Sequence, residues 1–466
     1  MEHARCLRRA ISPSSLRAHP QPRAQSQMSR SRPARNSAIY IGAAALQRGA
    51  PFLLLLVLAA LVPVDDFGKF AVLASIHGLL TSAATFGMES VAFRGIFAHE
   101  SKALEDRFYN TLVKFTFVGP IALAALIAAV LALTTDTLLT LAVGSIITTV
   151  LGGCLYAAGS TVPLARLRAQ ERVATYVIVV LVPAFVVAGT KFVLCGILSY
   201  GAFGWALGDL IGGATALAIA FPFQYSFLFG RRVSRSDLRG ALRIGLPLLP
   251  HVLSGWTLSL SDRLVIAGFF GATAAGRFAF AAQVAMIVTV LAGEINRGVL
   301  PLYGRVLQDS KVELLRRTVE VQRIATLLIA ALVAVGGWAA VAFLAPYDYR
   351  ASATWIPVLA LASGLFCLYF VPMNYLTVIA GRTTRMALIT SSAAAVNILI
   401  NVTLLPVLGI GVAAYSTLTA YLLLLVLTTS YAGKYDGTAW TGRSKACAGV
   451  LLTIMVTTIG LAAITV

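Results

Sequence analysis

Long apolar segments alternate with short polar connectors along almost the whole chain. A helix that crosses a hydrocarbon core of about 30 Å needs about 20 predominantly apolar residues. By this criterion the sequence predicts twelve spans, at residues 38–63, 69–93, 111–134, 137–160, 173–198, 202–225, 243–270, 275–301, 323–345, 353–380, 386–407 and 411–432. A thirteenth apolar segment occupies residues 446–466. The pattern therefore predicts an all-α polytopic membrane protein with twelve transmembrane helices and an extra C-terminal span.

The composition excludes a water-soluble protein. Hydrophobic residues make up 58% of the 466 residues and charged residues 12%, whereas a soluble domain has about 25% charged residues. No connector is long enough to hold an extramembrane catalytic domain. The five cysteines and five histidines show no metal-ligating spacing, and no GxxxxGK[ST] loop is present. We therefore expect no enzymatic activity, no cofactor and no metal site.

The distribution of positive charge predicts the orientation. Seven segments that would share one side of the membrane, counting the N-terminal tail, carry 29 of the 37 Lys and Arg residues, whereas the connectors on the other side carry only Lys69, Arg277 and Arg350. Cytoplasmic loops are enriched in Lys and Arg, so the N-terminus is expected inside. The net charge of +19 then reflects topology, and a nucleic-acid partner is not needed to explain it.

Residues 1–36 differ from the rest of the chain, with eight arginines, one acid and many Ser, Pro and Gln residues. No apolar segment typical of a signal peptide follows them directly. This composition indicates a disordered basic cytoplasmic tail. Two alternatives remain open, namely an organellar transit peptide and a true start at Met28.

The predicted hairpins on the outer side repeat in order. Gly68 and Gly204 mark the first and third hairpins, and Gly276 and Gly411 mark the fourth and sixth. The second and fifth hairpins turn at aspartates, Asp136 and Asp348. Glycine allows tight turns and close helix contacts. The repeat predicts two parallel six-helix lobes, 37–225 and 244–432, separated by a basic cytoplasmic linker, 226–243.

Three stretches resemble the polysaccharide (O-antigen and exopolysaccharide) flippases of the multidrug/oligosaccharidyl-lipid/polysaccharide exporter superfamily. Their sequences are DFGKFA at 66–71 with TFGME at 85–89, GLPLLPH at 245–251 with SDR at 261–263, and NILIN at 397–401 with GIGVAA at 409–414. The resemblance covers residues from about 37 to 432. The thirteenth apolar segment departs from the twelve-helix pattern, although relatives with fourteen helices exist.

The resemblance implies a transporter of the bacterial inner membrane. Its cargo would be a polyprenyl-pyrophosphate-linked oligosaccharide, moved from the cytoplasmic to the periplasmic leaflet for lipopolysaccharide or exopolysaccharide synthesis. Membrane lipids are the further partners, and a polysaccharide polymerase and other assembly proteins are candidates.

Ionisable residues inside spans are costly and usually face the bundle interior or a wet cavity. Arg48, Lys191 and Arg263 are candidates for a cavity that pairs with pyrophosphate, because Arg binds phosphate bidentately. A second set holds candidates for ion coupling or for structural pairs. Its members are Asp209, Asp262, Glu89, Glu294 and Arg297. Glu294 and Arg297 have the i,i+3 spacing of a helix pair. His251 is expected to be a packed residue, with a proton relay as the alternative.

Two other functions compete with the flippase. A drug/cation antiporter of the same superfamily would favour an acidic cavity, whereas the cations within these spans at least match the acids. A membrane glycosyltransferase or polysaccharide polymerase could use Asp65 and Asp66 as catalytic acids. Their loop is too short for a catalytic domain, and loop charge or a helix N-cap explains the pair better.

Overall fold

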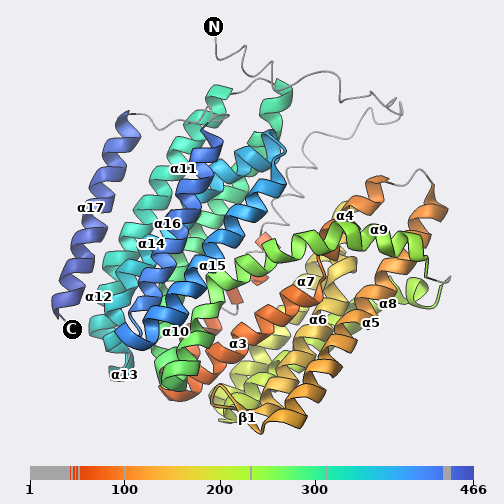
Figure 1. Ribbon diagram of the computed structural model, residues 1–466, viewed down its shortest axis with the longest axis horizontal. Coiled ribbons are helices and arrows are strands. Elements are labelled where there is room, and N and C mark those ends of the chain that lie inside the picture. Colours follow the sequence, from red (N-terminus) through yellow and green to blue (C-terminus); the bar gives the residue numbers. More distant parts are fainter. Residues whose placement is uncertain are drawn as a thin grey trace.

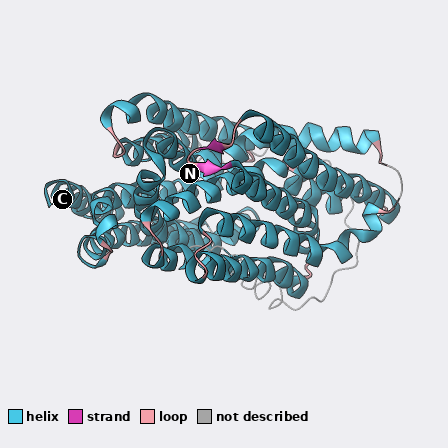
Figure 2. Cartoon of the chain, turned by 90° about the horizontal axis from the view of Figure 1, so that it is seen from below, coloured by secondary structure: helices cyan, strands magenta, loops and turns pink. Residues whose placement is uncertain are grey.

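The chain is almost entirely helical in the described residues. The computed structural model describes residues 42–43, 46–47, 49–50, 53–98, 101–230, 233–309, 312–433 and 442–465. Figure 2 shows helices throughout and one short strand pair. Strand β1 (Thr137–Leu138) pairs antiparallel with β2 (Leu141–Ala142) at the tip of one hairpin. The predicted all-α membrane fold is therefore confirmed, with this two-residue ribbon as a small addition.

The helices form two lobes that lie side by side in Figure 1. The N-terminal lobe contains a helical segment at 53–61. Its other helices are α3 (Val64–Ala84), α4 (Met88–Ala98), α5 (Lys102–Thr134), α6 (Val143–Ala169), α7 (Val173–Lys191) with the π-helix η2 (Phe192–Ile197), and α8 (Gly201–Leu228). Helix α6 packs against α3, α4, α5 and α8 and so forms the centre of the lobe. The segment predicted as the first span, 38–63, lies only partly within the described residues.

The C-terminal lobe begins with α10 (Leu249–Asp309), preceded by the 3₁₀ turn η3 (Leu246–Leu248). It continues through α11 (Val312–Leu332), η4 (Val333–Gly337), α12 (Trp338–Leu344), α13 (Tyr347–Arg350), η5 (Ala351–Trp355), α14 (Ile356–Asn374), η6 (Tyr375–Ile379), α15 (Thr383–Leu408) and α16 (Val412–Ala432). Helix α17 (Gly442–Thr465) packs outside this lobe on α11 and α14.

Helix α10 consists of two helices that are joined by a sharp turn at Gly271. Gly271 has φ 82° and ψ 179°, a conformation that glycine adopts at little cost. Gly409 has nearly the same angles, φ 88° and ψ 179°, at the end of α15. The chain therefore turns at Gly271 and Gly409. The turn expected at Gly411 is confirmed, because residues 409–411 connect α15 to α16. The turn expected at Gly276 is wrong, because Gly276 lies inside the second half of α10, beyond the turn at Gly271.

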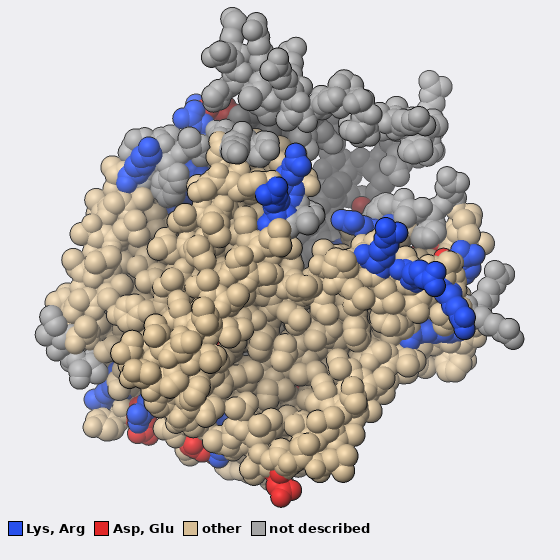
Figure 3. Space-filling model, in the orientation of Figure 1, with Lys and Arg blue, Asp and Glu red and all other residues tan. Residues whose placement is uncertain are grey.

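Eleven described segments are long and apolar enough to cross a membrane. One of them, Arg235–Leu300, contains both halves of α10, and the last, Lys445–Ala463, is the predicted extra C-terminal span. Most blue side chains in Figure 3 gather at one end of the described surface, and red ones gather at the opposite end. We name these the basic end, where α6 ends with Arg166 in its last turn and α11 begins, and the acidic end, where α3 begins with Asp65 in its first turn and where α13 with Asp348 lies.

The two lobes meet along a seam between α3 and both halves of α10, and the first half of α10 runs antiparallel to α3. A Cβ atom at Gly68 would lie 1.8 Å from the carbonyl oxygen of Ala272, so only glycine fits there. Near the middle of the seam, Trp256 Nε1 donates to the Ser75 carbonyl oxygen at 2.9 Å. Of the two roles predicted for Gly68, a tight turn and a close helix contact, the structure shows the second. Gly68 lies inside α3, and the chain enters this helix at Pro63.

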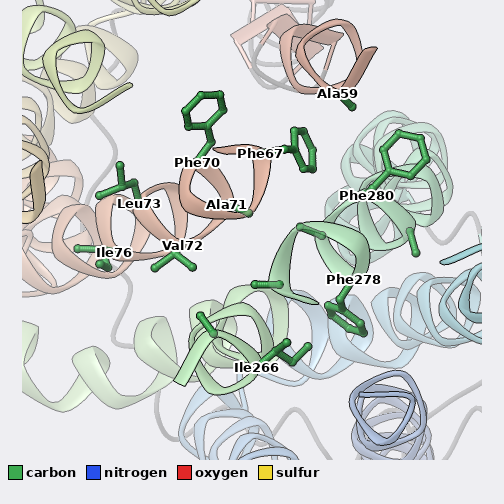
Figure 4. Packing of buried hydrophobic residues seen from close by; sticks show 14 of the residues in the cluster. Ala59, Phe67, Phe70, Ala71, Val72, Leu73, Ile76, Ile266, Phe278 and Phe280 are labelled. Carbon is green, nitrogen blue, oxygen red and sulfur yellow. The ribbon is translucent and has the colours of Figure 1, made fainter. Parts of the chain in front are cut away.

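Aromatic side chains extend the seam at the acidic end. The rings of Phe67 and Phe280 have centroids 6.4 Å apart, and Tyr349 packs against both. Figure 4 shows Phe67, Phe70 and Val72 on α3 beside Ile266, Phe278 and Phe280 on α10. These residues belong to one buried hydrophobic cluster. The lobes are thus joined by apolar packing near the acidic end.

The segment predicted as a linker, 226–243, is largely helical in the described residues. Helix α9 (Arg235–Gly245) begins at the N-cap Ser234, whose side chain accepts from the Asp237 amide. Arg107 on α5 binds the Asp237 carboxylate through two nitrogens, at 3.0 and 3.2 Å. These contacts hold α9 against the N-terminal lobe at the basic end.

Candidate functional site

The N-terminal lobe contains a buried ion pair between neighbouring helices. Lys191, the last residue of α7, places its Nζ 2.5 Å from Asp209 Oδ1 on α8, and the side chains are only 6% and 3% exposed. A Cβ at Gly208 would lie 2.4 Å from Lys191 Cγ, so the glycine makes room for the lysine stem. The free-energy cost of removing both charges from water is offset by their mutual attraction.

Three further side chains surround this pair. The Lys191 ammonium lies 3.8 Å from the centroid of the Trp205 ring, a cation–π contact. Thr149 Oγ1 donates to Asp209 Oδ2 at 3.4 Å. His77 Nδ1 lies 3.5 Å from Asp209 Oδ1, but it does not meet the geometry of a hydrogen bond. Asp209 is therefore held by one strong partner and two weaker ones.

A cavity of about 230 Å³ borders the pair. Its wall includes His77, Tyr156, Lys191 and Asp209, while helix α7 contributes mainly apolar side chains. Gln47 also lines it and donates to the Tyr156 hydroxyl at 2.8 Å. The cavity thus brings together a cation, a carboxylate and an imidazole inside the spans.

The C-terminal lobe holds a second buried carboxylate, Asp262 on α10, in a different environment. Its Oδ1 accepts from Asn401 Nδ2 at 2.6 Å, and its Oδ2 accepts from Thr417 Oγ1 at 2.8 Å. Ser416 donates to Asn401 Oδ1 at 2.7 Å and accepts from Asn397 Nδ2 at 3.3 Å. All the hydrogen-bond donors to Asp262 within the described residues are neutral. The network ties α10 to α15 and α16.

The predicted cavity cations do not form one group in the described residues. Arg48 lies outside the described residues. Lys191 belongs to the N-terminal lobe and is paired with Asp209. Arg263 belongs to the C-terminal lobe, is 5% exposed, and donates from Nη1 to the Ser259 carbonyl oxygen at 2.9 Å. The role of these residues in binding substrate therefore stays a prediction.

Three further ionisable residues singled out in the sequence, Glu89, Glu294 and His251, contact polar side chains in the structure. Glu89 pairs with Arg168 at 3.2 Å, and both are well exposed at the basic end. Glu294 pairs with Arg297 on the same helix face, as their spacing predicts. His251 Nδ1 lies 2.8 Å from Thr390 Oγ1 and joins α10 to α15.

Asp65 and Asp66 are engaged at the acidic end. Lys69 Nζ lies 2.7 Å from Asp65 and 3.5 Å from Asp66, and Thr273 donates to Asp65 at 3.0 Å. Both acids lie in the first turn of α3, but neither is its N-cap, which is Pro63. These contacts link the lobes across the seam and favour a structural role over a catalytic one.

Sequence reasoning missed His77, Trp205 and the neutral partners of Asp262. One signal could have found the last of these. Asp209 follows Gly204 at the same spacing at which Ser416 follows Gly411, and Ser416 hydrogen-bonds Asn401, which donates to Asp262. Within the described part of the chain, no group of three or more His, Cys, Asp or Glu side chains could hold a metal ion.

Comparison with known proteins identifies the family. The family model described as polysaccharide biosynthesis protein matches residues 34–307, more than half of the chain. No curated protein sequence matches significantly.

Solved structures share the fold at low sequence identity. The lipid II flippase MurJ, in an inward closed conformation, is 13% identical with a TM-score of 0.64, and the match covers 91% of each chain. An inward-facing MATE multidrug resistance transporter of the MOP superfamily is 13% identical with a TM-score of 0.55, and the match covers 85% of this chain and 99% of the other. A eukaryotic MATE transporter is 14% identical with a TM-score of 0.55, covering 90% and 99%. The chain therefore belongs to the polysaccharide biosynthesis protein family and has the multi-pass membrane fold of the MOP superfamily.

Proposed function

We propose that the protein flips a polyprenyl-pyrophosphate-linked oligosaccharide from the cytoplasmic to the periplasmic leaflet of the bacterial inner membrane. The observation that carries this proposal is the match to the polysaccharide biosynthesis family over residues 34–307. The fold that the chain shares with a lipid II flippase supports it. The two lobes would alternate access to the cargo around the seam, without enzymatic chemistry. The product would feed polysaccharide or lipopolysaccharide synthesis.

In this proposal the basic end faces the cytoplasm, together with the N-terminus. Most Lys and Arg side chains gather at the basic end, and cytoplasmic segments are enriched in these residues, which supports that orientation. The lobes would correspond to residues 37–225 and 244–432. A polysaccharide polymerase and other assembly proteins would receive or accompany the cargo, and membrane lipids would surround it.

The pyrophosphate of the cargo needs cations where water is scarce. Lys191 is already neutralised by Asp209, so it contributes less free charge than an unpaired cation. A guanidinium has five N–H donors. The structure describes one hydrogen bond from Arg263, to the Ser259 carbonyl oxygen. Arg48 has no acidic neighbour in the sequence. Arg48 and Arg263 are therefore the principal candidates for binding the diphosphate.

Asp262 is the leading candidate for ion coupling. Its hydrogen-bond donors are neutral, so its charge can be neutralised by a bound proton or cation. Asp209, by contrast, is already paired with Lys191. Glu89, Glu294 and Arg297 would serve as structural pairs. Export would then depend on the charge of Asp262 more than on its packing.

The test of the cargo proposal is complementation of an export-deficient strain, normalised to the amount of protein in the membrane. Arg48→Ala is expected to reach normal levels and to lose glycan export, because a mid-span cation is needed by the cargo and not by the fold. Arg48→Lys should retain part of the activity, because the charge survives without bidentate geometry. Arg317→Ala, which removes an exposed cation, is the matched control. Full export by Arg48→Ala would remove Arg48 from the transport path.

A drug/cation antiporter is the second candidate function, because multidrug transporters share the fold. Its test is drug susceptibility. Expression in a sensitive strain should leave the inhibitory concentrations of cationic drugs unchanged if the cargo is a lipid-linked glycan. Resistance that depends on Asp262 would favour the antiporter.

A further inference from the structure

A second cavity opens at the basic end of the N-terminal lobe, away from the Lys191–Asp209 pair. It has a volume of about 260 Å³ and lies between α5, α6 and α8. Arg166, Gln170 and Arg172 line it together with Gln224, and none of its lining residues is acidic. Since one water occupies about 30 Å³, the cavity has room for a polar group of several heavy atoms.

Two prolines shape this cavity. Pro163 lies inside α6 and Pro222 inside α8, and both line the cavity. Proline has no amide hydrogen, so Pro163 leaves the carbonyl oxygen of Gly159, four residues earlier, without its helical donor. Gln224 Nε2 lies 3.5 Å from that oxygen and donates to it. This contact fixes the orientation of the Gln224 amide.

The orientation of Gln224 leaves an acceptor without a donor. The residue is 1% exposed, and its Oε1 is buried with no hydrogen-bond partner. A buried polar atom without a partner costs about 1–3 kcal/mol. A ligand that brought a hydroxyl group into the cavity would remove this cost.

Arg166 supplies the opposite kind of unsatisfied group. Its guanidinium lies 4.5 Å from the centroid of the Phe227 ring and 5.2 Å from that of Tyr109. These rings hold the cation in place, yet its Nε is buried and has no hydrogen-bond partner. Arg172 is exposed at the same cavity, and neither arginine forms an ion pair within the described residues. The cavity therefore offers fixed positive charge with free donors.

We propose that this cavity binds the headgroup of an anionic glycerophospholipid of the phosphatidylglycerol type. The phosphate would accept from Arg166 and Arg172, and a glycerol hydroxyl would donate to Gln224 Oε1. Basic cavities between transmembrane helices on the cytoplasmic side are a known means of binding anionic lipid headgroups. Apolar wall residues such as Val113 and Val162 suit the adjoining glycerol and acyl segments. The proposal does not rest on the proposed function, because the cavity lies within the N-terminal lobe and not at the seam between the lobes.

Native mass spectrometry of the full chain in detergent tests the proposal, with phosphatidylglycerol, phosphatidylethanolamine and inorganic phosphate as probes. The parent protein should retain phosphatidylglycerol at least about tenfold more than phosphatidylethanolamine, since hydrogen bonds to charged groups are strong. Arg166→Gln should lower this retention about tenfold. Arg172→Gln should lower it several-fold and, because Arg172 is exposed, should not disturb folding. Arg317→Gln, a cation of the other lobe that pairs with Glu313, should leave retention unchanged.

Three results would overturn the proposal. Equal retention by the parent, Arg166→Gln and Arg172→Gln would place the lipid elsewhere. Equal retention of both phospholipids would remove the selectivity for an anionic headgroup. Displacement of phosphatidylglycerol by millimolar inorganic phosphate would assign the cavity to a free anion and not to a lipid.

Discussion

Within the described residues each lobe buries one carboxylate, and the surroundings of the two carboxylates differ. Asp209 in the N-terminal lobe lies against the Lys191 ammonium, with His77 and Thr149 beside it. Asp262 in the C-terminal lobe is held by the side chains of Asn401 and Thr417. The first site is a closed ion pair. The second carboxylate accepts hydrogen bonds from neutral groups, while the Arg263 guanidinium interacts with it electrostatically without forming an ion pair.

This difference separates structural charge from charge that can change. Moving an unpaired charge out of water is costly, and an ion pair offsets part of that cost only while both partners are present. Asp209 and Lys191 are therefore expected to support the fold as a pair. Asp262 forms no ion pair in the described residues, although the buried Arg263 guanidinium attracts it electrostatically, so its charge is less tightly fixed by one partner than that of Asp209. The two lobes thus bury a carboxylate in unequal chemical surroundings.

Breaking the ion pair should have the largest effect on stability. Asp209→Ala leaves the Lys191 ammonium buried without its partner, which is expected to cost about 3–5 kcal/mol of folding stability. Thermal unfolding of the purified protein in detergent would measure the loss. The double substitution Lys191→Met with Asp209→Leu should recover most of it, because an apolar pair of similar volume replaces both charges. If the double variant were as unstable as Asp209→Ala, the loss would lie in packing and not in the stranded charge.

The matching change in the other lobe should separate stability from transport. Asp262→Asn keeps the volume of the side chain and most of its hydrogen-bonding capacity, so its effect on stability should stay within about 1.5 kcal/mol. Glycan export by this variant should nevertheless fall to the background of the export-deficient strain. Export and membrane level are measured on the same cells. Normal export by Asp262→Asn would move the coupling role away from the C-terminal lobe.

The threonines that contact the two carboxylates offer a smaller, paired test. Thr417 donates to Asp262 at 2.8 Å, whereas Thr149 donates to Asp209 at 3.4 Å. Hydrogen bonds to charged groups contribute about 1.5–3 kcal/mol when their geometry is good. Thr417→Val should therefore destabilise the protein by about 1–2 kcal/mol, and Thr149→Val by about 0.5 kcal/mol or less. Equal thermal shifts for the two variants would contradict the view that Asp262 depends on its neutral donors and Asp209 on Lys191.

The spans could be read from the sequence because the length of an apolar segment is a one-dimensional property. The extra C-terminal helix α17 and the break between the halves of α10 both follow from it. The position of the turn was harder to predict. Gly271 and Gly276 look alike in sequence, but only Gly271 has a left-handed φ, while Gly276 lies inside a helix where it meets the Val64 carbonyl oxygen.

The contacts between buried charges could not be predicted, because they depend on how each helix is rotated about its axis. Lys191 and Asp209 stand on consecutive helices, yet nothing in their spacing shows that they face each other. His77 is a single histidine in an apolar segment, which is usually a packed residue. The cavity at Arg166 depends on Pro163 and Gln224, which are far apart in sequence and meet only between α6 and α8. Spacing within one helix was more informative, as the Glu294–Arg297 pair shows.

We propose above that the protein moves a lipid-linked oligosaccharide across the bilayer, and transport can be measured with purified components. The most direct measurement reconstitutes the purified full chain into liposomes that carry a polyprenyl-pyrophosphate-linked oligosaccharide labelled on its sugar. A glycosidase or lectin added outside reports how much cargo has changed leaflet over time. Translocation should exceed that of empty liposomes and should fall to their level with Arg48→Ala, while Arg317→Ala should behave as the parent. Translocation no faster than in empty liposomes, with the parent protein folded and inserted, would contradict it.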